Sequence, residues 1–138
     1  MKLLKPLLLA MFPTLLLSCS NECKIYDYSD VTHIEWEHIF DIESDYYYIY
    51  VYSLSCGHCK DIKEEIINFA MKKDNETYFV LYNKDIPVVD SNYVLIGKTN
   101  YQDLGIVGTP TLFEISNHFV SDVCTGSESI IKTLTKHN

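Results

Sequence analysis

Runs of apolar residues predict where the strands of this chain lie. The clearest run is YYYIYVYS, residues 46–53, which is aromatic or β-branched at nearly every position. A strand without polar alternation is typical of the centre of a sheet whose two faces are both covered. We therefore expect a central, fully buried strand here, and a second strand over YFVLY, residues 78–82.

The segment between these two strands changes to a helical period. In KDIKEEIINFAMKK, residues 60–73, the apolar side chains of Ile62, Ile66, Phe69 and Ala70 recur at the spacing of one helix face. The pattern predicts a helix that begins shortly after the central strand ends.

The remaining segments are shorter and less regular. Residues 31–44 predict a short strand leading into a short helix, and residues 83–101 fit either a hairpin turning at residues 90–92 or an irregular excursion. Residues 101–126 predict a helical turn, a loop around Pro110 and two strands hinged at residues 116–118. A final amphipathic helix follows, with Ser127 as its expected N-cap.

The N-terminus has the features of an export signal. Two lysines precede an apolar stretch, residues 7–17, which ends at the small residues Ser18 and Cys19. The stretch is shorter than the roughly 18 residues of a membrane-spanning helix. We expect residues 1–18 to be removed as a signal peptide.

The ending Leu-Leu-Ser-Cys, residues 16–19, resembles the lipobox of bacterial lipoproteins. This resemblance implies that Cys19 is acylated, that residues 19–29 form a lipidated tether, and that the protein sits on the extracytoplasmic face of a bacterial cell membrane. An ordinary signal peptide cut nearby, or an anchor that is never cut, is the alternative.

The length of the chain limits the number of domains, and its charge limits the kinds of binding partner. The 138 residues suit one domain, and losing the leader's two lysines would take the formal charge from −8 to −10. An acidic surface repels nucleic acid and anionic lipid, so we expect no nucleic-acid partner and membrane contact through the acyl group alone.

The segment SLSCGHCKDI, residues 53–62, carries the candidate chemistry. Cys56 and Cys59 are expected in the first turn of the helix, close enough to form a disulfide. Unpaired N–H groups at a helix N-terminus stabilise a thiolate, which lowers cysteine pKa values from about 8.5 to about 3.5–7.5. Cys56 is therefore the expected nucleophile and Cys59 the resolving thiol.

Two motifs together resemble the thioredoxin superfamily. VYSLSCGHCKDI, residues 51–62, resembles its active-site segment in the protein disulfide isomerase version, and VGTPTL, residues 107–112, resembles its cis-proline loop. The resemblance implies an α/β, thioredoxin-like fold over residues 30–138, a central mixed β-sheet flanked by helices. It also implies a cis bond before Pro110, for which a trans turn proline is the alternative, and substrate contacts from Thr109, Pro110 and Gly57.

His58, between the two cysteines, is the candidate tuning residue. Its imidazole would donate a hydrogen bond to the Cys56 thiolate and stabilise the reduced pair. The reduction potential of the pair would then be closer to that of protein disulfide isomerase than to that of thioredoxin. The alternative is a solvated histidine without a role.

Four positions depart from the family pattern. Ser55 replaces the tryptophan before the first cysteine, Tyr50 replaces a buried acid, Leu81 replaces its lysine partner, and Glu64 lies near the position of a helix-kinking proline. A phenol with a pKa near 10 is a poor base for the Cys59 proton, which argues against fast reduction of substrates.

Other uses of the cysteines fit less well. A zinc site needs about four ligands and the chain has one C-x-x-C, while haem attachment requires a histidine where Lys60 stands. Cys124 is expected to be a small buried hydrophobic residue of the last strand rather than a catalytic thiol, and Cys23, in the tether, is either free or paired.

The sequence thus predicts a membrane-anchored, extracytoplasmic thiol-disulfide oxidoreductase that exchanges disulfides with protein substrates. It needs no metal or cofactor beyond the Cys56–Cys59 disulfide, but it does need a redox partner, which the sequence does not identify. The alternative is a redox-inactive or copper-binding module of the same fold that holds a partner protein.

Overall fold

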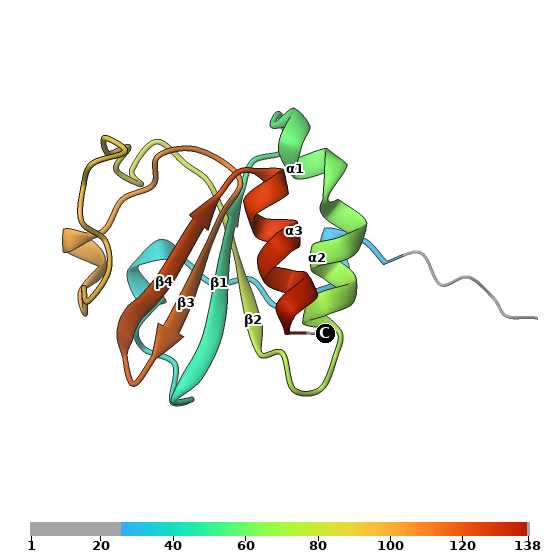
Figure 1. Ribbon diagram of the computed structural model, residues 1–138, viewed down its shortest axis with the longest axis horizontal. Helices are drawn as coiled ribbons and strands as arrows, with labels where there is room; N and C mark the ends of the chain where they lie inside the picture. The colour runs from blue at the N-terminus through green and yellow to red at the C-terminus, as the bar shows by residue number, and fades with distance from the viewer. Residues whose placement is uncertain (1–25, 138) are drawn as a thin grey trace, which may run out of the picture.

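A computed structural model describes residues 26–137 as one sheet with helices on one side of it (Figure 1). The strands are β1 (Tyr46–Tyr52), β2 (Thr77–Leu81), β3 (Thr111–Ser116) and β4 (Phe119–Thr125). The helices are α1 (Gly57–Asp61), α2 (Lys63–Ala70) and α3 (Ser127–Lys136). Single 3-10 turns lie at Tyr28–Asp30, Trp36–His38 and Tyr101–Asp103.

The sheet has the order β2-β1-β3-β4 and is mixed. β1 runs parallel to β2 and antiparallel to β3, and β3 and β4 form an antiparallel pair. Tyr50, in the middle of β1, lies between Phe79 of β2 and Leu112 of β3. The predicted mixed sheet and the order of its elements are confirmed.

The central strand is buried on both faces, as its composition predicts. All residues of β1 after Tyr46 are buried. Alternate side chains, Tyr48, Tyr50 and Tyr52, pack against the three helices. The others pack against loops and 3-10 turns from the segments 34–42 and 82–106, which cover the opposite face (Figure 1).

The loop-covered face is less regular than expected. The predicted strand within residues 31–44 is reduced to an isolated bridge between His33 and Phe79. Residues 83–101 form an irregular excursion rather than a hairpin, because Val88 pairs with Ile106 instead of with a neighbouring segment. Gly105 permits this pairing, since a Cβ there would lie 2.5 Å from the Val89 side chain.

Two helix boundaries differ from the prediction. The helix after the cysteines is interrupted at Ile62, where φ is −109° and ψ is 11°, so a break occurs without a proline. Ser127 is the first helical residue rather than the N-cap. Gly126 takes the cap position because its φ of 89° suits glycine, and its N–H donates to the Pro110 carbonyl at 2.9 Å.

Between residues 26 and 137, no helix combines the length and apolar character needed to cross a membrane. The predicted signal peptide, Cys19 and Cys23 lie outside the described residues.

Candidate redox site

Cys56 and Cys59 form a disulfide at the start of α1, with their Cα atoms 5.2 Å apart. Cys56 is the N-cap residue, and its Sγ accepts the backbone N–H of Cys59 at 3.1 Å. Cys56 is half-buried, whereas Cys59 is 1% exposed. Cys56 is therefore the more accessible sulfur of the pair, and the roles of Cys56 as nucleophile and Cys59 as resolving thiol stay predictions.

The second motif meets the first in space. The Thr109–Pro110 peptide bond is cis, and the Thr109 carbonyl oxygen lies 3.3 Å from Sγ of Cys56. The buried Thr111 holds this loop, because its hydroxyl donates to the Gly108 carbonyl at 2.6 Å. The fold thus brings together two segments that lie far apart in the sequence.

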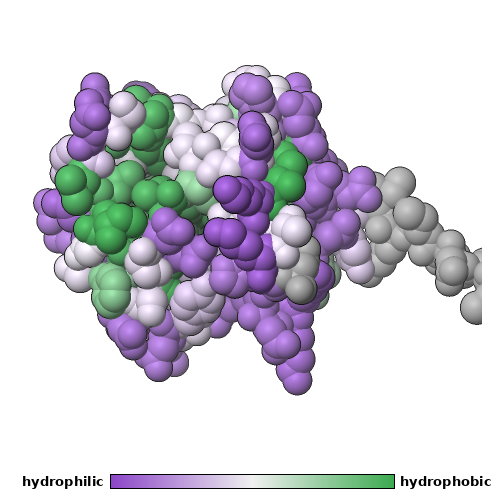
Figure 2. Space-filling view, viewed as in Figure 1, coloured by the Kyte–Doolittle hydropathy of each residue, from purple (hydrophilic) through white to green (hydrophobic). Residues whose placement is uncertain are grey.

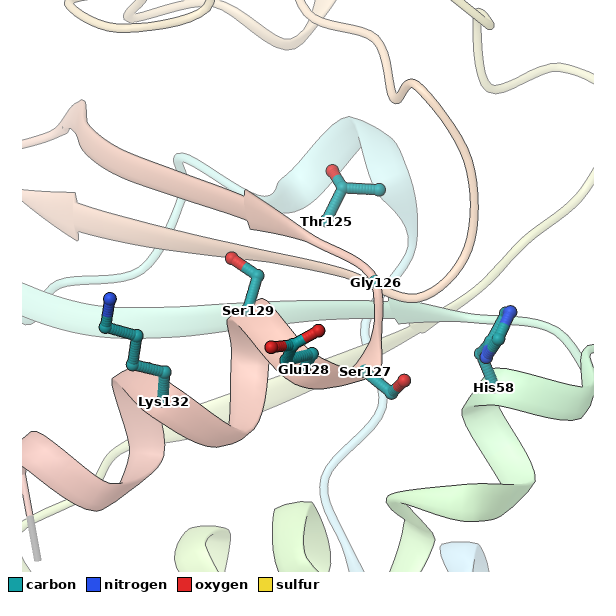
Figure 3. A pocket seen from close by; sticks show the side chains of 7 residues that line it. All are labelled: His58, Thr125, Gly126, Ser127, Glu128, Ser129 and Lys132. Atoms are coloured by element: carbon teal, nitrogen blue, oxygen red, sulfur yellow. The ribbon is translucent and has the colours of Figure 1, made fainter.

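His58 projects from α1 into an open pocket of about 500 Å³ between α1 and the start of α3 (Figure 3). Its side chain is 72% exposed, and its Nδ1 lies 3.8 Å from the Asp61 carboxylate. The rest of the pocket comes from Thr125, Gly126, Ser127, Glu128, Ser129 and Lys132. The tuning of Cys56 by His58 stays a prediction.

An apolar rim lies beside the disulfide. Leu54, two positions before Cys56, is 63% exposed, and Val107, two positions before Thr109, is 42% exposed. Val88, paired with Ile106 directly beside this loop, is 66% exposed. Figure 2 shows apolar surface gathered over the side of the molecule that the loops form, away from α1. Near the disulfide, the rim consists of the exposed side chains of Leu54 and Val107, each two positions from a residue of the contact between Cys56 and Thr109.

Two tyrosines, Tyr50 and Tyr28, belong to or pack against the buried cluster that contains Cys59. Tyr50 is fully buried, and its hydroxyl has no hydrogen-bond partner within the described part of the chain. Burial raises the pKa of Tyr50, so its phenol keeps its proton and is not a base for Cys59. The Tyr28 hydroxyl donates to the Cys59 carbonyl at 3.4 Å.

Tyr28 belongs to an N-terminal clasp, residues 26–30, that packs on the domain. Its ring stacks on Tyr52 with centroids 4.1 Å apart. Lys63 of α2 lies 5.0 Å from the centre of the Tyr28 ring and forms a 2.6 Å ion pair with Asp27. Residues 26–29 belong to the expected tether, residues 19–29, and the sequence does not indicate that Tyr28 contacts the site. The two tyrosines of KIYDYS were the only signal for this contact.

Two further residues singled out in the sequence, Cys124 and Leu81, lie in β4 and at the end of β2. Cys124 is a free, half-buried thiol in β4, and burial raises its pKa. Leu81 is 45% exposed at the end of β2 beside Tyr52. Over residues 26–137, no three His, Cys, Asp or Glu side chains are grouped as a metal site requires.

Comparison with known proteins identifies the fold. No protein-family model and no curated protein sequence matches this chain. Solved thioredoxin structures do match, among them thioredoxin f2 of Chlamydomonas reinhardtii, with a TM-score of 0.52, 16% identity, and 78% of this chain and 96% of that chain covered. The thioredoxin of Malassezia sympodialis matches with a TM-score of 0.53, 20% identity, and 78% and 90% covered.

The thioredoxin of Aeropyrum pernix gives a TM-score of 0.51 at 20% identity, over 75% of this chain and 82% of that chain. These proteins come from distant organisms, and each of the three aligns with at least 75% of this chain. The chain therefore has the thioredoxin fold, with a C-x-x-C disulfide and a cis-proline that meet at one site.

Proposed function

We propose that this protein is a thiol-disulfide oxidoreductase whose substrates are protein thiols and disulfides. The observation that carries the proposal is the contact between Cys56 and the Thr109 carbonyl, with Cys59 buried behind it. A half-buried sulfur beside an exposed apolar rim suits attack by a cysteine on another protein chain. No cofactor is needed, because the Cys56–Cys59 disulfide itself accepts two electrons when it is reduced to two thiols.

In the oxidising direction, a substrate thiolate attacks Sγ of Cys56. The Cys56–Cys59 bond breaks, a mixed disulfide forms, and Cys59 leaves as a thiolate that takes up a proton. A second substrate thiolate then attacks the substrate sulfur of the mixed disulfide, and Cys56 leaves. The substrate is oxidised to a disulfide and the pair is reduced to two thiols; reduction of a substrate runs the same steps backwards.

The surroundings of the pair favour oxidation or isomerisation over fast reduction. Cys56 lies at the N-terminus of α1, where backbone N–H groups stabilise its thiolate. Tyr50 stands where a carboxylate would act as a base for Cys59, and the proposed tuning by His58 would stabilise the reduced form further. A stabilised reduced pair is a stronger oxidant.

We place this activity on the extracytoplasmic face of a bacterial membrane, anchored by an acyl group on Cys19. The export signal and the lipobox-like residues 16–19 support this location. A redox partner must regenerate the pair, and one structural relative, a thioredoxin f2, has been solved in complex with a ferredoxin:thioredoxin reductase. We infer a partner of the same general kind, a protein that exchanges electrons with the pair.

A trapping experiment tests the proposal. In an export-competent strain, Cys59→Ala with Cys56 intact should accumulate mixed disulfides with substrate proteins, visible on non-reducing gels and lost on reduction. Cys124→Ala, in an otherwise normal chain, is the matched control and should trap nothing. Absence of adducts, together with uptake of one equivalent of copper per chain, would identify a binding module instead.

A further inference from the structure

The hydroxyl of Tyr50 is the anomaly of the central strand. Each of the other four tyrosines in β1 has a hydrogen bond for its hydroxyl: Tyr46 and Tyr48 with each other, Tyr47 with the Ile39 carbonyl, and Tyr52 with His33. Tyr50 has none within residues 26–137, although it is fully buried. A buried hydroxyl without a hydrogen bond destabilises the folded state, so a compensating role is expected.

Tyr50 does not stand alone behind the disulfide. Its hydroxyl lies close enough to that of Tyr28 for each phenol to alter the pKa of the other. The Tyr28 hydroxyl in turn donates to the carbonyl of Cys59, and Tyr50 and Cys59 belong to the same buried cluster. One phenol therefore contacts the backbone of the buried cysteine, and the second phenol lies close to the first.

Breaking the disulfide creates a demand for hydrogen-bond donors at this place. Cys59 leaves as a thiolate although it is 1% exposed, and burial in apolar surroundings disfavours a charged sulfur. Lys63, the cation at the clasp, is already engaged by Asp27 and the Tyr28 ring. Burial raises the pKa values of Tyr28 and Tyr50, so both hydroxyls keep their protons and remain donors.

We propose that Tyr28 and Tyr50 are positioning residues that stabilise the reduced form of Cys59 more than its oxidised form. In the disulfide state the Tyr50 hydroxyl has no hydrogen-bond partner within residues 26–137, and in the reduced state the Cys59 sulfur becomes its acceptor. The two hydroxyls thereby shift the equilibrium of the pair toward the dithiol and make the protein more oxidising. This inference rests on the proposed function, because it concerns the redox equilibrium of the same two cysteines.

The clasp has a defined part in this arrangement. It places the Tyr28 hydroxyl at the carbonyl of Cys59 in α1, and the Asp27–Lys63 ion pair and the stacking on Tyr52 hold Tyr28 there. The segment that enters the domain from the N-terminal side therefore contributes a side chain to the redox site.

The experiment measures the equilibrium of the pair with glutathione in the full-length chain purified in detergent. Two glutathione thiols reduce the disulfide and become glutathione disulfide, so two electrons and two protons pass to the cysteines. Tyr50→Phe should shift this equilibrium about tenfold toward the disulfide, which corresponds to about 30 mV. Tyr28→Phe should shift it at least threefold in the same direction, and the double variant should show less than the product of the two effects.

Tyr46→Phe is the matched control, because it removes a hydroxyl from the opposite end of the same strand, where Tyr48 and Glu114 bind it. It should change the equilibrium by less than twofold. Shifts below twofold in Tyr50→Phe and Tyr28→Phe, or an equal shift in Tyr46→Phe, would overturn the inference. If Tyr50→Phe does not fold, Tyr28→Phe alone tests the inference: a shift of at least threefold supports it, and a smaller shift overturns it.

The failure of this inference is distinguishable from failure of the proposed function. A wild-type pair that equilibrates with glutathione, with all three variants unchanged, overturns the role of the tyrosines alone. A wild-type pair that never equilibrates overturns the proposed function and the inference together.

Discussion

The carbonyl oxygen of Thr109 lies 3.3 Å from Sγ of Cys56, although 53 positions separate the two residues. The contact joins a loop between the excursion and β3 to the N-terminus of α1, so the site depends on how that loop is held. Two groups of contacts hold it: the Thr111 hydroxyl on one side, and the pairing of residue 106 with residues 87–89 on the other. Each can be tested separately.

The Thr111 hydroxyl should contribute to both stability and reactivity. It is buried and bonds to the Gly108 carbonyl and to the Thr125 hydroxyl. Thr111→Val leaves the carbonyl of the half-buried Gly108 without this donor and should lower the free energy of unfolding by about 1–3 kcal/mol, measured by urea denaturation. Thr135→Val removes a hydroxyl bond on an exposed turn of α3 and should change stability by less than about 0.5 kcal/mol. Equal losses in the two variants would contradict a holding role for Thr111.

Gly105 should be intolerant of a side chain. A Cβ at this position would lie 2.5 Å from the Val89 side chain and 2.8 Å from the Pro87 carbonyl oxygen. Gly105→Ala should therefore cost about 1–3 kcal/mol of stability and slow disulfide exchange, since it separates the excursion from the Thr109 loop. At Gly108 a Cβ meets nothing within 4 Å, so Gly108→Ala serves as the control for stability. Equal thermal denaturation midpoints for the two variants would show that the close packing at Gly105 is not needed.

The clasp should be visible in the titration of Asp27. Its hydrogen bond with Lys63 holds the pKa of this carboxyl below its usual range. A lowered pKa in the folded state means that the interaction stabilises the fold above the unfolded pKa, and is lost as the pH falls through the folded value. Lys63→Met should bring the Asp27 pKa back toward its ordinary value in an NMR titration, whereas Lys73→Met should not change it. An unchanged Asp27 pKa in Lys63→Met would refute the contact.

The three cysteines of the described domain should differ in reactivity toward iodoacetamide. After reduction, Cys56 should be alkylated at least about tenfold faster than Cys124 at neutral pH, because a helix N-terminus lowers a thiol pKa and burial raises it. Mass spectrometry of quenched samples gives both rates, and Cys59, at 1% exposure, should react slowest. Faster alkylation of Cys124 than of Cys56 would be inconsistent with Cys56 as the nucleophile.

Much of the fold was predictable because local pattern and tertiary environment agree. The side chains of β1 are aromatic or β-branched without polar alternation, so both faces of this strand must be buried. The helical spacing of apolar residues after the cysteines matches α1 and α2. The paired motifs around Cys56 and Pro110 predicted that these two segments meet. The two motifs, residues 51–62 and 107–112, are short, but their order along the chain and their positions next to the predicted strands are specific.

The excursion and the clasp were not predictable from local pattern. The path of residues 83–106 depends on the pairing of Val88 with Ile106 and on the lack of a side chain at Gly105, which are tertiary effects. Tyr28 lies in a polar stretch without a period, so nothing local indicates that its ring stacks on Tyr52. Ser127 has the chemistry of an N-cap, but the turn from β4 needs the positive φ that Gly126 supplies.

The reduction potential of the Cys56–Cys59 pair in the full-length wild-type chain, measured in glutathione buffers of graded ratio, tests the proposed activity most directly. We expect a reversible two-electron transition nearer to the roughly −180 mV of protein disulfide isomerase than to the roughly −270 mV of thioredoxin. A pair that stays in one state across the whole range of buffers would contradict the proposed activity.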